Sequence, residues 1–255
     1  MGGKAARWLG IVTLVMMTAA IFMVFDYVPT DAEQGIVQRI FYFHVPCAWV
    51  AFAAFGLVAI SGAFYLWFGE QLWDDLGYAA AEVGMVFCTI VLVTGSIWAK
   101  PIWGAWWTWD SRLTTTLVLW LLYAGYLTLR ITADEVPQVG RFAAVVGIVA
   151  AADVPVIIVS VRLWRTIHPA VIVTRQGGHG LEDPRMIATL LVSMVAVTAL
   201  GVWLLMLRFA TLRITARIAQ LGRELALMER ELADRAKPDV VLNVIRGEAS
   251  AIETA

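Results

Sequence analysis

The chain has 255 residues, of which 60% are hydrophobic and only 15% are charged, and its formal net charge is −1. Soluble domains are nearer half apolar and about a quarter charged, so this composition excludes an ordinary water-soluble protein and indicates a membrane protein. The near-neutral charge gives no sign of a nucleic-acid partner.

Six stretches have the length of about 20 apolar residues that a helix needs to span a bilayer. They are residues 8–28, 46–69, 78–99, 114–133, 141–163 and 186–209. The first follows Lys4 and Arg7 and resembles a signal peptide, but it lacks an Ala-x-Ala cleavage site, so we interpret it as a retained anchor. The sequence therefore predicts an all-α, polytopic membrane protein with six transmembrane helices, and a membrane domain over residues 1–209.

An even number of spans places both termini on one side of the membrane. The first, third and fifth connections, residues 29–45, 100–113 and 164–185, then lie together on the opposite side. Lys and Arg residues near the spans are almost equally divided between the two sides, so the positive-inside rule gives only a slight preference for cytoplasmic termini.

A heptad stripe of apolar residues follows the sixth span. It consists of Ile214, Ile218, Leu221, Leu225, Met228 and Leu232. The stripe predicts a cytoplasmic amphipathic helix over residues 210–236, followed by a flexible tail over 237–255. Such a helix could pack on the protein's own loops, lie on lipid headgroups or dock a cytoplasmic partner.

The third connection contains an unusual concentration of tryptophan. In the sequence PIWGAWWTWDSRLT, residues 101–114, four tryptophans fall within seven positions, and Trp98 lies just before them. The four are Trp103, Trp106, Trp107 and Trp109. An interfacial aromatic belt would be spread over several helix ends, so this local cluster predicts a flat aromatic surface on which a ligand lies.

The chain has only three histidines, and two of them are predicted at the same membrane face as the tryptophans. His44 immediately precedes the second span and His168 follows the fifth, whereas His179 lies in a polar stretch and is expected to be solvated. Two neutral imidazoles beside an aromatic surface are typical of heme ligation, and nearby Arg or Lys suits the propionates. Zinc would need three or four ligands, which these loops do not supply.

The remaining polar candidates allow more than one interpretation. Asp110 could accept a hydrogen bond from an indole N–H or from Arg112 and so shape the loop, and Arg112 could instead meet a propionate. Within the spans, Asp153 and Glu82 are candidates for a functional role, because carboxylates inside a membrane are costly. The favoured interpretation is that Asp153 is protonated and hydrogen-bonded to a neighbouring helix, with Pro155 opening the helix at Ala151. Glu82 is expected to reach the surface by snorkelling. Cys47 and Cys88 lie in apolar runs outside any CxxC or CxxCH motif.

Three segments resemble one protein family closely. They are WGAWWTWDSRLT (103–114), RIFYFHVPCAW (39–49) and GSIWAKPIWGAWWTWDSRLT (95–114), with weaker similarity in LWRTIHP (163–169). The first is similar to the WWD signature of heme-handling proteins, and together they resemble the heme exporter protein C (CcmC) family of the bacterial cytochrome c maturation pathway. The resemblance runs from about residue 33 to about residue 169 and continues more weakly to about 210.

This resemblance implies a six-helix inner-membrane protein whose WWD loop and histidines face the periplasm. His44 and His168 would be axial ligands of heme b, and Trp98, Trp103, Trp106, Trp107, Trp109, Asp110 and Arg112 would form the heme platform. The implied partners are the periplasmic heme chaperone CcmE, the ABC-transporter subunits CcmA and CcmB, the small membrane protein CcmD and membrane lipid.

Two other functions remain as alternatives. A membrane redox protein would need histidine pairs inside the spans at more than one depth, and the sequence predicts no histidine within a span. A heme-export channel would need a polar path across the bilayer, for which only Glu82 and Asp153 are available. No GxxxxGK[ST] phosphate-binding loop occurs, so any use of ATP would depend on a partner.

Overall fold

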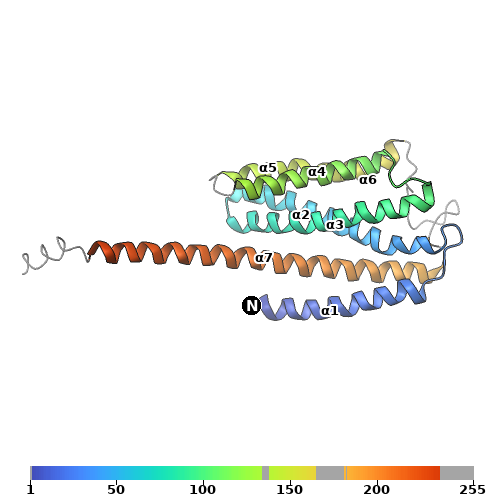
Figure 1. Cartoon of the computed structure of the whole chain (residues 1–255), viewed down its shortest axis with the longest axis horizontal. Coiled ribbons are helices and arrows are strands. Elements are labelled where there is room, and N and C mark those ends of the chain that lie inside the picture. The colour runs from blue at the N-terminus through green and yellow to red at the C-terminus, as the bar shows by residue number, and fades with distance from the viewer. Residues whose placement is uncertain (1, 134–137, 165–180, 182, 236–255) are drawn as a thin grey trace, which may run out of the picture. The chain divides into compact units, whose positions relative to one another are not determined.

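The computed structural model describes residues 2–133, 138–164, 181 and 183–235, and these are almost entirely helical (Figure 1). The helices are α1 (Gly2–Phe22), α2 (Phe41–Phe68), α3 (Gln71–Trp103), α4 (Ser111–Thr132), α5 (Val139–Ala151), α6 (Asp153–Leu163) and α7 (Pro184–Arg235). A π-helical turn, Met23–Tyr27, extends α1, and a 3₁₀ turn, Ile36–Ile40, precedes α2. The chain divides into two units, Met1–Phe209 and Ala210–Ala255.

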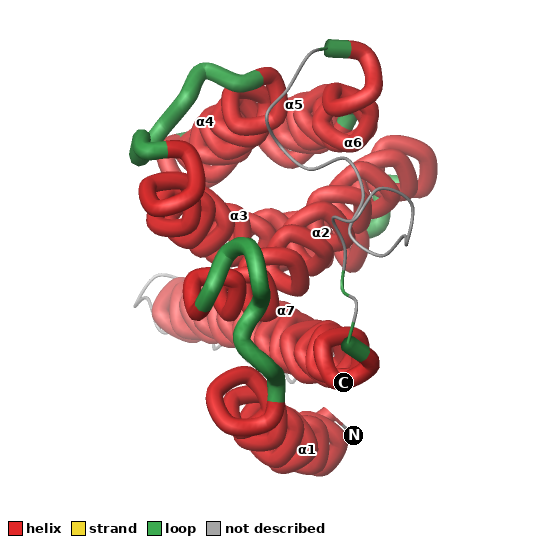
Figure 2. The backbone as a smooth tube through the Cα atoms, turned by 90° about the vertical axis from the view of Figure 1, so that its right-hand side faces the viewer, coloured by secondary structure: helices red, strands yellow, loops and turns green. Residues whose placement is uncertain are grey.

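The prediction of six spans in an all-α membrane protein is confirmed. Six helical segments in the described ranges are long and apolar enough to cross a bilayer: Gly3–Tyr27, Ile36–Phe68, Gln71–Trp103, Ser111–Thr132, Val139–Ser160 and Pro184–Ala233. The first combines α1 with the π-helical turn, the second combines the 3₁₀ turn with α2, and the fifth combines α5 and α6. In the end-on view of Figure 2, α2, α3, α4, α5 and α6 surround a common interior.

Helices α2 and α3 begin earlier than the sequence predicts. The predicted second span starts at Pro46, but Pro46 lies inside α2 and only deprives the carbonyl of Tyr42 of its usual helical donor. The predicted connection over residues 70–77 is mostly helical, because α3 begins at Gln71. Asp74, which limits the apolar stretch in the sequence, is buried at 8% exposure and neutralised by an ion pair.

Aromatic packing and small residues hold α2, α3, α4 and α5 together. The rings of Phe55 and Tyr123 are stacked, with centroids 3.9 Å apart, and the Tyr123 hydroxyl donates to the Gly147 carbonyl at 3.0 Å. At Gly84 the ring of Phe55 comes so close that an added Cβ would lie 2.6 Å from it. Small residues allow such close helix packing where apolar burial alone gives little drive, as in a membrane.

The fifth span is broken where the sequence predicts an opening. α5 ends at Ala151 and α6 begins at Asp153, since Pro155 has no N–H to donate to the Ala151 carbonyl. The expected hydrogen bond of Asp153 to a neighbouring helix is not found at Oδ2, which is buried and has no hydrogen-bond partner within the described part of the chain.

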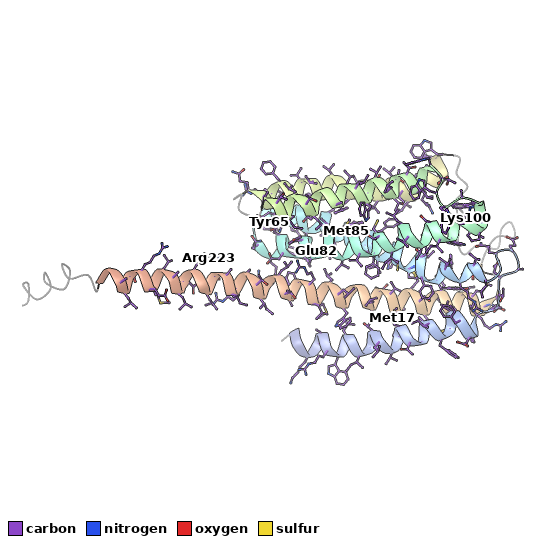
Figure 3. The ribbon with its side chains drawn as sticks, in the orientation of Figure 1. Met17, Tyr65, Glu82, Met85, Lys100 and Arg223 are labelled. Carbon is purple, nitrogen blue, oxygen red and sulfur yellow. The ribbon has the colours of Figure 1, made fainter. Side chains whose placement is uncertain are left out.

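Charged side chains join α3 to α4 and to α7 near the start of α3. Arg130 of α4 donates to both carboxylate oxygens of Asp74, one of them at 2.9 Å, and Arg208 donates to both oxygens of Glu82, one at 2.8 Å. Both guanidinium groups also lie over the ring of Tyr78. The side chain of Glu82 is 28% exposed and that of Arg208 is 36% exposed, so Arg208 neutralises a carboxylate that is only partly buried, and the expectation that Glu82 snorkels stays a prediction. Figure 3 shows Glu82 and Lys100 toward opposite ends of α3.

The second unit contains the C-terminal part of α7, which remains helical to Arg235. All six residues of the heptad stripe are exposed. The nature of the surface that the stripe contacts stays a prediction.

Candidate functional site

A cavity of about 350 Å³ lies at the end of the bundle that carries the tryptophan loop. Small-molecule sites typically have volumes of about 300–1,000 Å³ and mostly apolar walls with a few polar groups. Its walls come from α2, α3, α4 and α6, with single residues from α7 and from two loops. The residues that line it are Gln34, His44, Val45, Ala48, Trp49, Phe52, Val91, Leu92, Gly95, Ser96, Trp98, Ala99, Ile102, Trp103, Trp107, Arg112, Leu113, Thr116, Ile157, Ile158 and Met194.

His44 lies on the first turn of α2 and lines this cavity. Its ring packs edge-to-face against Trp98 of α3, with centroids 5.8 Å apart. The expectation that no histidine lies within a span is wrong for His44, because the 3₁₀ turn and α2 extend the second candidate span back to Ile36. It still lies near the loop end of that long segment, so it provides one histidine at one depth, not the series that a transmembrane redox path needs.

The tautomer of His44 follows from its hydrogen bond to α3. Nδ1 of His44 lies 2.9 Å from Oγ1 of Thr94, and that hydroxyl also lies 2.7 Å from the carbonyl oxygen of Ile90. A carbonyl can only accept, so the hydroxyl proton points to Ile90 and the Thr94 oxygen accepts from Nδ1–H. The lone pair of His44 is then on Nε2, which is the arrangement that suits an imidazole metal ligand.

Gly95 and Gln34 fix the surroundings of the histidine. A Cβ placed on Gly95 would lie 3.1 Å from Cε1 of His44, so the absence of a side chain there gives the imidazole its room. The indole N–H of Trp98 donates to Oε1 of Gln34 at 2.9 Å, which ties the first connection to α3. The indole ring of Trp98, which lies beside His44, is thus held by both packing and a hydrogen bond.

The tryptophan loop divides into rings that line the cavity and rings that do not. Trp103, the last residue of α3, and Trp107 line it, whereas Trp106 and Trp109 are exposed. Trp107 and Trp109 meet edge-to-face, with their planes at 81°. The four rings therefore do not form the flat surface that the sequence predicts, since Gly104, with φ at 77°, ends α3 and turns the chain within the cluster.

Asp110 begins α4. It is the N-cap of that helix, and its carboxylate accepts from the backbone N–H of Arg112 at 3.0 Å. A carboxylate in this place stabilises the helix start through both the hydrogen bond and the helix dipole. This geometry gives Asp110 the loop-shaping role that the sequence left open, with the backbone of Arg112 as the donor. The side chain of Arg112 lines the cavity.

Buried hydroxyls near the same loop have no hydrogen-bond partner among the described residues. They are Oγ1 of Thr108, Oγ of Ser111 and Oγ1 of Thr114. Buried polar atoms are nearly always satisfied, so the partners of these three oxygens come from outside the described residues.

The fifth connection is represented by few described residues. His168 and His179 both lie outside them, so the predicted second ligand has no described position. Leu181, which is described, packs against the cluster that contains Val28 and Phe41, and Trp98 packs against the same cluster. Leu181 therefore lies at the end of the first unit where the first connection meets α3, and the position of the rest of the fifth connection stays a prediction.

Several residues of the cavity were not singled out in the sequence. Gln34 of the cavity wall and Thr94 behind His44 are ordinary polar residues in the sequence. A signal was available for Trp49 and Gly95, which end and begin the family-like segments 39–49 and 95–114. The others become recognisable only when α2 packs on α3.

Comparison with known proteins gives consistent matches. The family model of heme exporter protein C, CcmC, matches residues 1–223. The heme exporter protein C of Bradyrhizobium diazoefficiens is 35% identical over 201 residues, which cover 79% of this chain and 76% of that protein. The heme exporter protein C of Escherichia coli K12 is 34% identical over 208 residues, covering 80% and 82%. A putative cytochrome c biosynthesis ccmC-like mitochondrial protein of Marchantia polymorpha is 35% identical over 149 residues, covering 58% and 63%.

Proposed function

The chain belongs to the heme exporter protein C family, and from this premise we propose that it holds heme in the cavity at the tryptophan loop and delivers it to a heme chaperone. Membership of the family gives the chain a role in heme handling for cytochrome c maturation, as a multi-pass membrane component of the Ccm heme-transport system. The site, the ligands and the delivery step are our proposals.

The observation that carries the proposal is the presentation of His44 inside an aromatic cavity. Nδ1 of His44 lies 2.9 Å from the Thr94 hydroxyl, and the imidazole lines the same cavity as Trp98 and Trp103, so we propose Nε2 as the nitrogen that binds iron. We propose His168 as the second axial ligand, supplied by the fifth connection. Heme iron accepts neutral imidazoles on both axial sides.

The other groups at the cavity fit the periphery of heme. Trp98, Trp103 and Trp107 offer apolar faces to the porphyrin, and Arg112 offers a guanidinium to a propionate. The buried hydroxyls of Thr108 and Ser111 are further donors near the same end. We propose heme b, bound without a covalent attachment, since neither cysteine is part of a CxxCH motif.

The exposed part of the loop suits contact with another protein. Trp106 and Trp109 are exposed beside the cavity, and Asp110 fixes the loop to α4. We propose that this surface meets the chaperone CcmE on the periplasmic side of the inner membrane, with both termini cytoplasmic. CcmA, CcmB and CcmD are the proposed membrane and ATP-binding partners.

Absorption spectra of the purified chain test the proposal. The wild type should bind hemin with the paired bands of a bis-imidazole heme. His44→Ala and His168→Ala should each lose heme and change the spectrum, whereas His179→Ala, the matched control, should do neither. An unchanged spectrum in His44→Ala, or an equal loss in His179→Ala, would contradict the two-ligand arrangement.

A further inference from the structure

One side of the cavity, between α2 and α6, opens on the outer surface of the bundle. Trp49 of α2 and Ile158 of α6 line the cavity, and they are also 54% and 56% exposed. A side chain that lines a cavity and keeps more than half of its surface accessible marks a place where the cavity wall is open. The neighbouring Ile157 lines the cavity at 2% exposure, so the wall closes again immediately inward of Ile158.

The opening lies within apolar, membrane-spanning segments. Trp49 is one turn inside the apolar stretch 46–69, and the step from His44 to Trp49 corresponds to about 7 Å along a helix. Ile158 belongs to the candidate span Val139–Ser160. Both residues are large and apolar, and the exposed side chains next to them on α6 include Val156 and Val159. In a bilayer that these segments span, such an opening would lie against lipid.

The imidazole, amide and guanidinium groups of the cavity wall lie at its loop end, whereas Ser96 and Thr116 add hydroxyls further along α3 and α4. His44 and Gln34 belong to the region where the first connection meets α2, and Arg112 begins α4 beside the tryptophan loop. The wall toward the middle of the bundle is made of apolar residues such as Phe52 and Val91. The cavity therefore has the polarity of a membrane leaflet, with a polar end at the level of the loops and an apolar end deeper in.

We propose that the opening between α2 and α6, bounded by Trp49 and Ile158, is a lateral portal through which heme passes between the lipid phase and the cavity. This rests on the proposed function of the same cavity. Heme is a flat, largely apolar molecule with two carboxylates on one edge. By moving sideways it keeps those carboxylates at the level of the loops, near Arg112, and keeps its apolar edges in hydrocarbon. Passage through the loop end would bring the apolar edges through water.

A pair of neighbouring substitutions tests the portal. Ile158→Trp places a larger ring at the opening, whereas Val159→Trp adds a similar ring at an adjacent position that is 40% exposed and does not line the cavity. The full chain in lipid nanodiscs is mixed with hemin-loaded phosphatidylcholine vesicles or with albumin-bound hemin in water. The change of the Soret band with time gives the rate of heme uptake. The rate of release is measured in the same way after excess apomyoglobin is added as the acceptor.

Ile158→Trp should slow uptake from vesicles and release by a similar factor of about ten, a barrier about 1.4 kcal/mol higher, since one passage serves both directions. Val159→Trp should match the wild type, and wild-type uptake should be faster from vesicles than from albumin. The portal is overturned if the two variants take up heme at the same rate, or if Ile158→Trp only accelerates release, which is the sign of a lost contact. If the wild type binds no hemin from either source, the proposed function itself fails.

Discussion

Nδ1 of His44 and Oγ1 of Thr94 lie 2.9 Å apart, although the two residues are 50 positions apart in the chain. The contact joins α2 to α3 and sets which nitrogen of the imidazole carries the proton. The Thr94 hydroxyl can accept from His44 because its own proton is directed to the Ile90 carbonyl. Outer hydrogen bonds of this kind orient ligating histidines and raise their basicity.

Removing this acceptor should weaken heme binding without removing the ligand. Thr94→Val preserves the shape of the side chain but leaves Nδ1–H without its partner, so hemin affinity should fall by about 10–100-fold and the Soret maximum should shift. Thr94→Ser, the matched control, should bind like the wild type. Hemin titration of the purified variants measures both. Equal affinities for the valine and serine variants would show that the hydroxyl has no positioning role.

The space beside the imidazole gives a second prediction. In Gly95→Ala the new Cβ would lie 3.1 Å from Cε1 of His44, so the ring must shift by a few tenths of an ångström and the ligand geometry should suffer. Gly56→Ala, on α2 with nothing within 4 Å of its Cβ position, is the control. We expect altered hemin spectra and weaker retention only in Gly95→Ala. Wild-type spectra in that variant would mean that His44 is not held as tightly as its contacts indicate.

The division within the tryptophan loop gives a third prediction. Trp107 lines the cavity, and burying one such side chain contributes roughly 1–3 kcal/mol, so Trp107→Ala should lower heme affinity about tenfold or more. Trp106 is exposed outside the cavity, and Trp106→Ala should retain heme but transfer it poorly to the chaperone. Heme content and chaperone loading, measured on the same preparations, distinguish the two. Equal heme loss in both variants would mean that the loop acts as one surface.

Much of the fold could be predicted from local sequence, because span length and apolarity are properties of single segments. The helix starts could not, since they depend on distant partners. Asp74 looks like a break in an apolar run until Arg130 neutralises it from another helix. Pro46 similarly looks like a boundary, although a helix can continue through it near its beginning.

The candidate site, like the fold, could be predicted only where its residues are close together in the sequence. The composition of the third connection predicts an aromatic site, because four tryptophans fall within seven positions of the chain. Which of them line the cavity depends on the turn at Gly104, which sequence composition does not reveal. Thr94 and Gly95 acquire a role only through the register of α2 against α3, which places them at His44.

The ion pairs away from the site should matter for stability. Asp74 is buried, so Asp74→Asn would leave Arg130 without its charge partner, and removal of one member of a buried pair costs about 3–5 kcal/mol. The melting temperature of the Asp74→Asn variant in detergent, followed by circular dichroism at the helical band, should fall clearly below that of the wild type. Asp183→Asn breaks a local, exposed pair with Arg185 and should change it little. Equal melting temperatures for the two variants would show that the Asp74 pair is not a stabilising link between α3 and α4.

Two substitutions of Asp110 distinguish the effect of the shape of the loop from the effect of the carboxylate charge. Asparagine caps helices about as well as aspartate, so Asp110→Asn should still accept from the Arg112 N–H and keep the start of α4, whereas Asp110→Ala loses a cap contact that typically contributes about 1 kcal/mol. Heme retention should therefore be near normal in Asp110→Asn and reduced in Asp110→Ala. Chaperone loading should fall in both, because the carboxylate lies beside the exposed rings that we assign to the docking surface. Heme content and loading are to be measured together in the two variants. If Asp110→Asn loses heme and loading in the same proportion, binding and transfer depend on one property of the loop, and the separate docking role of Asp110 is wrong.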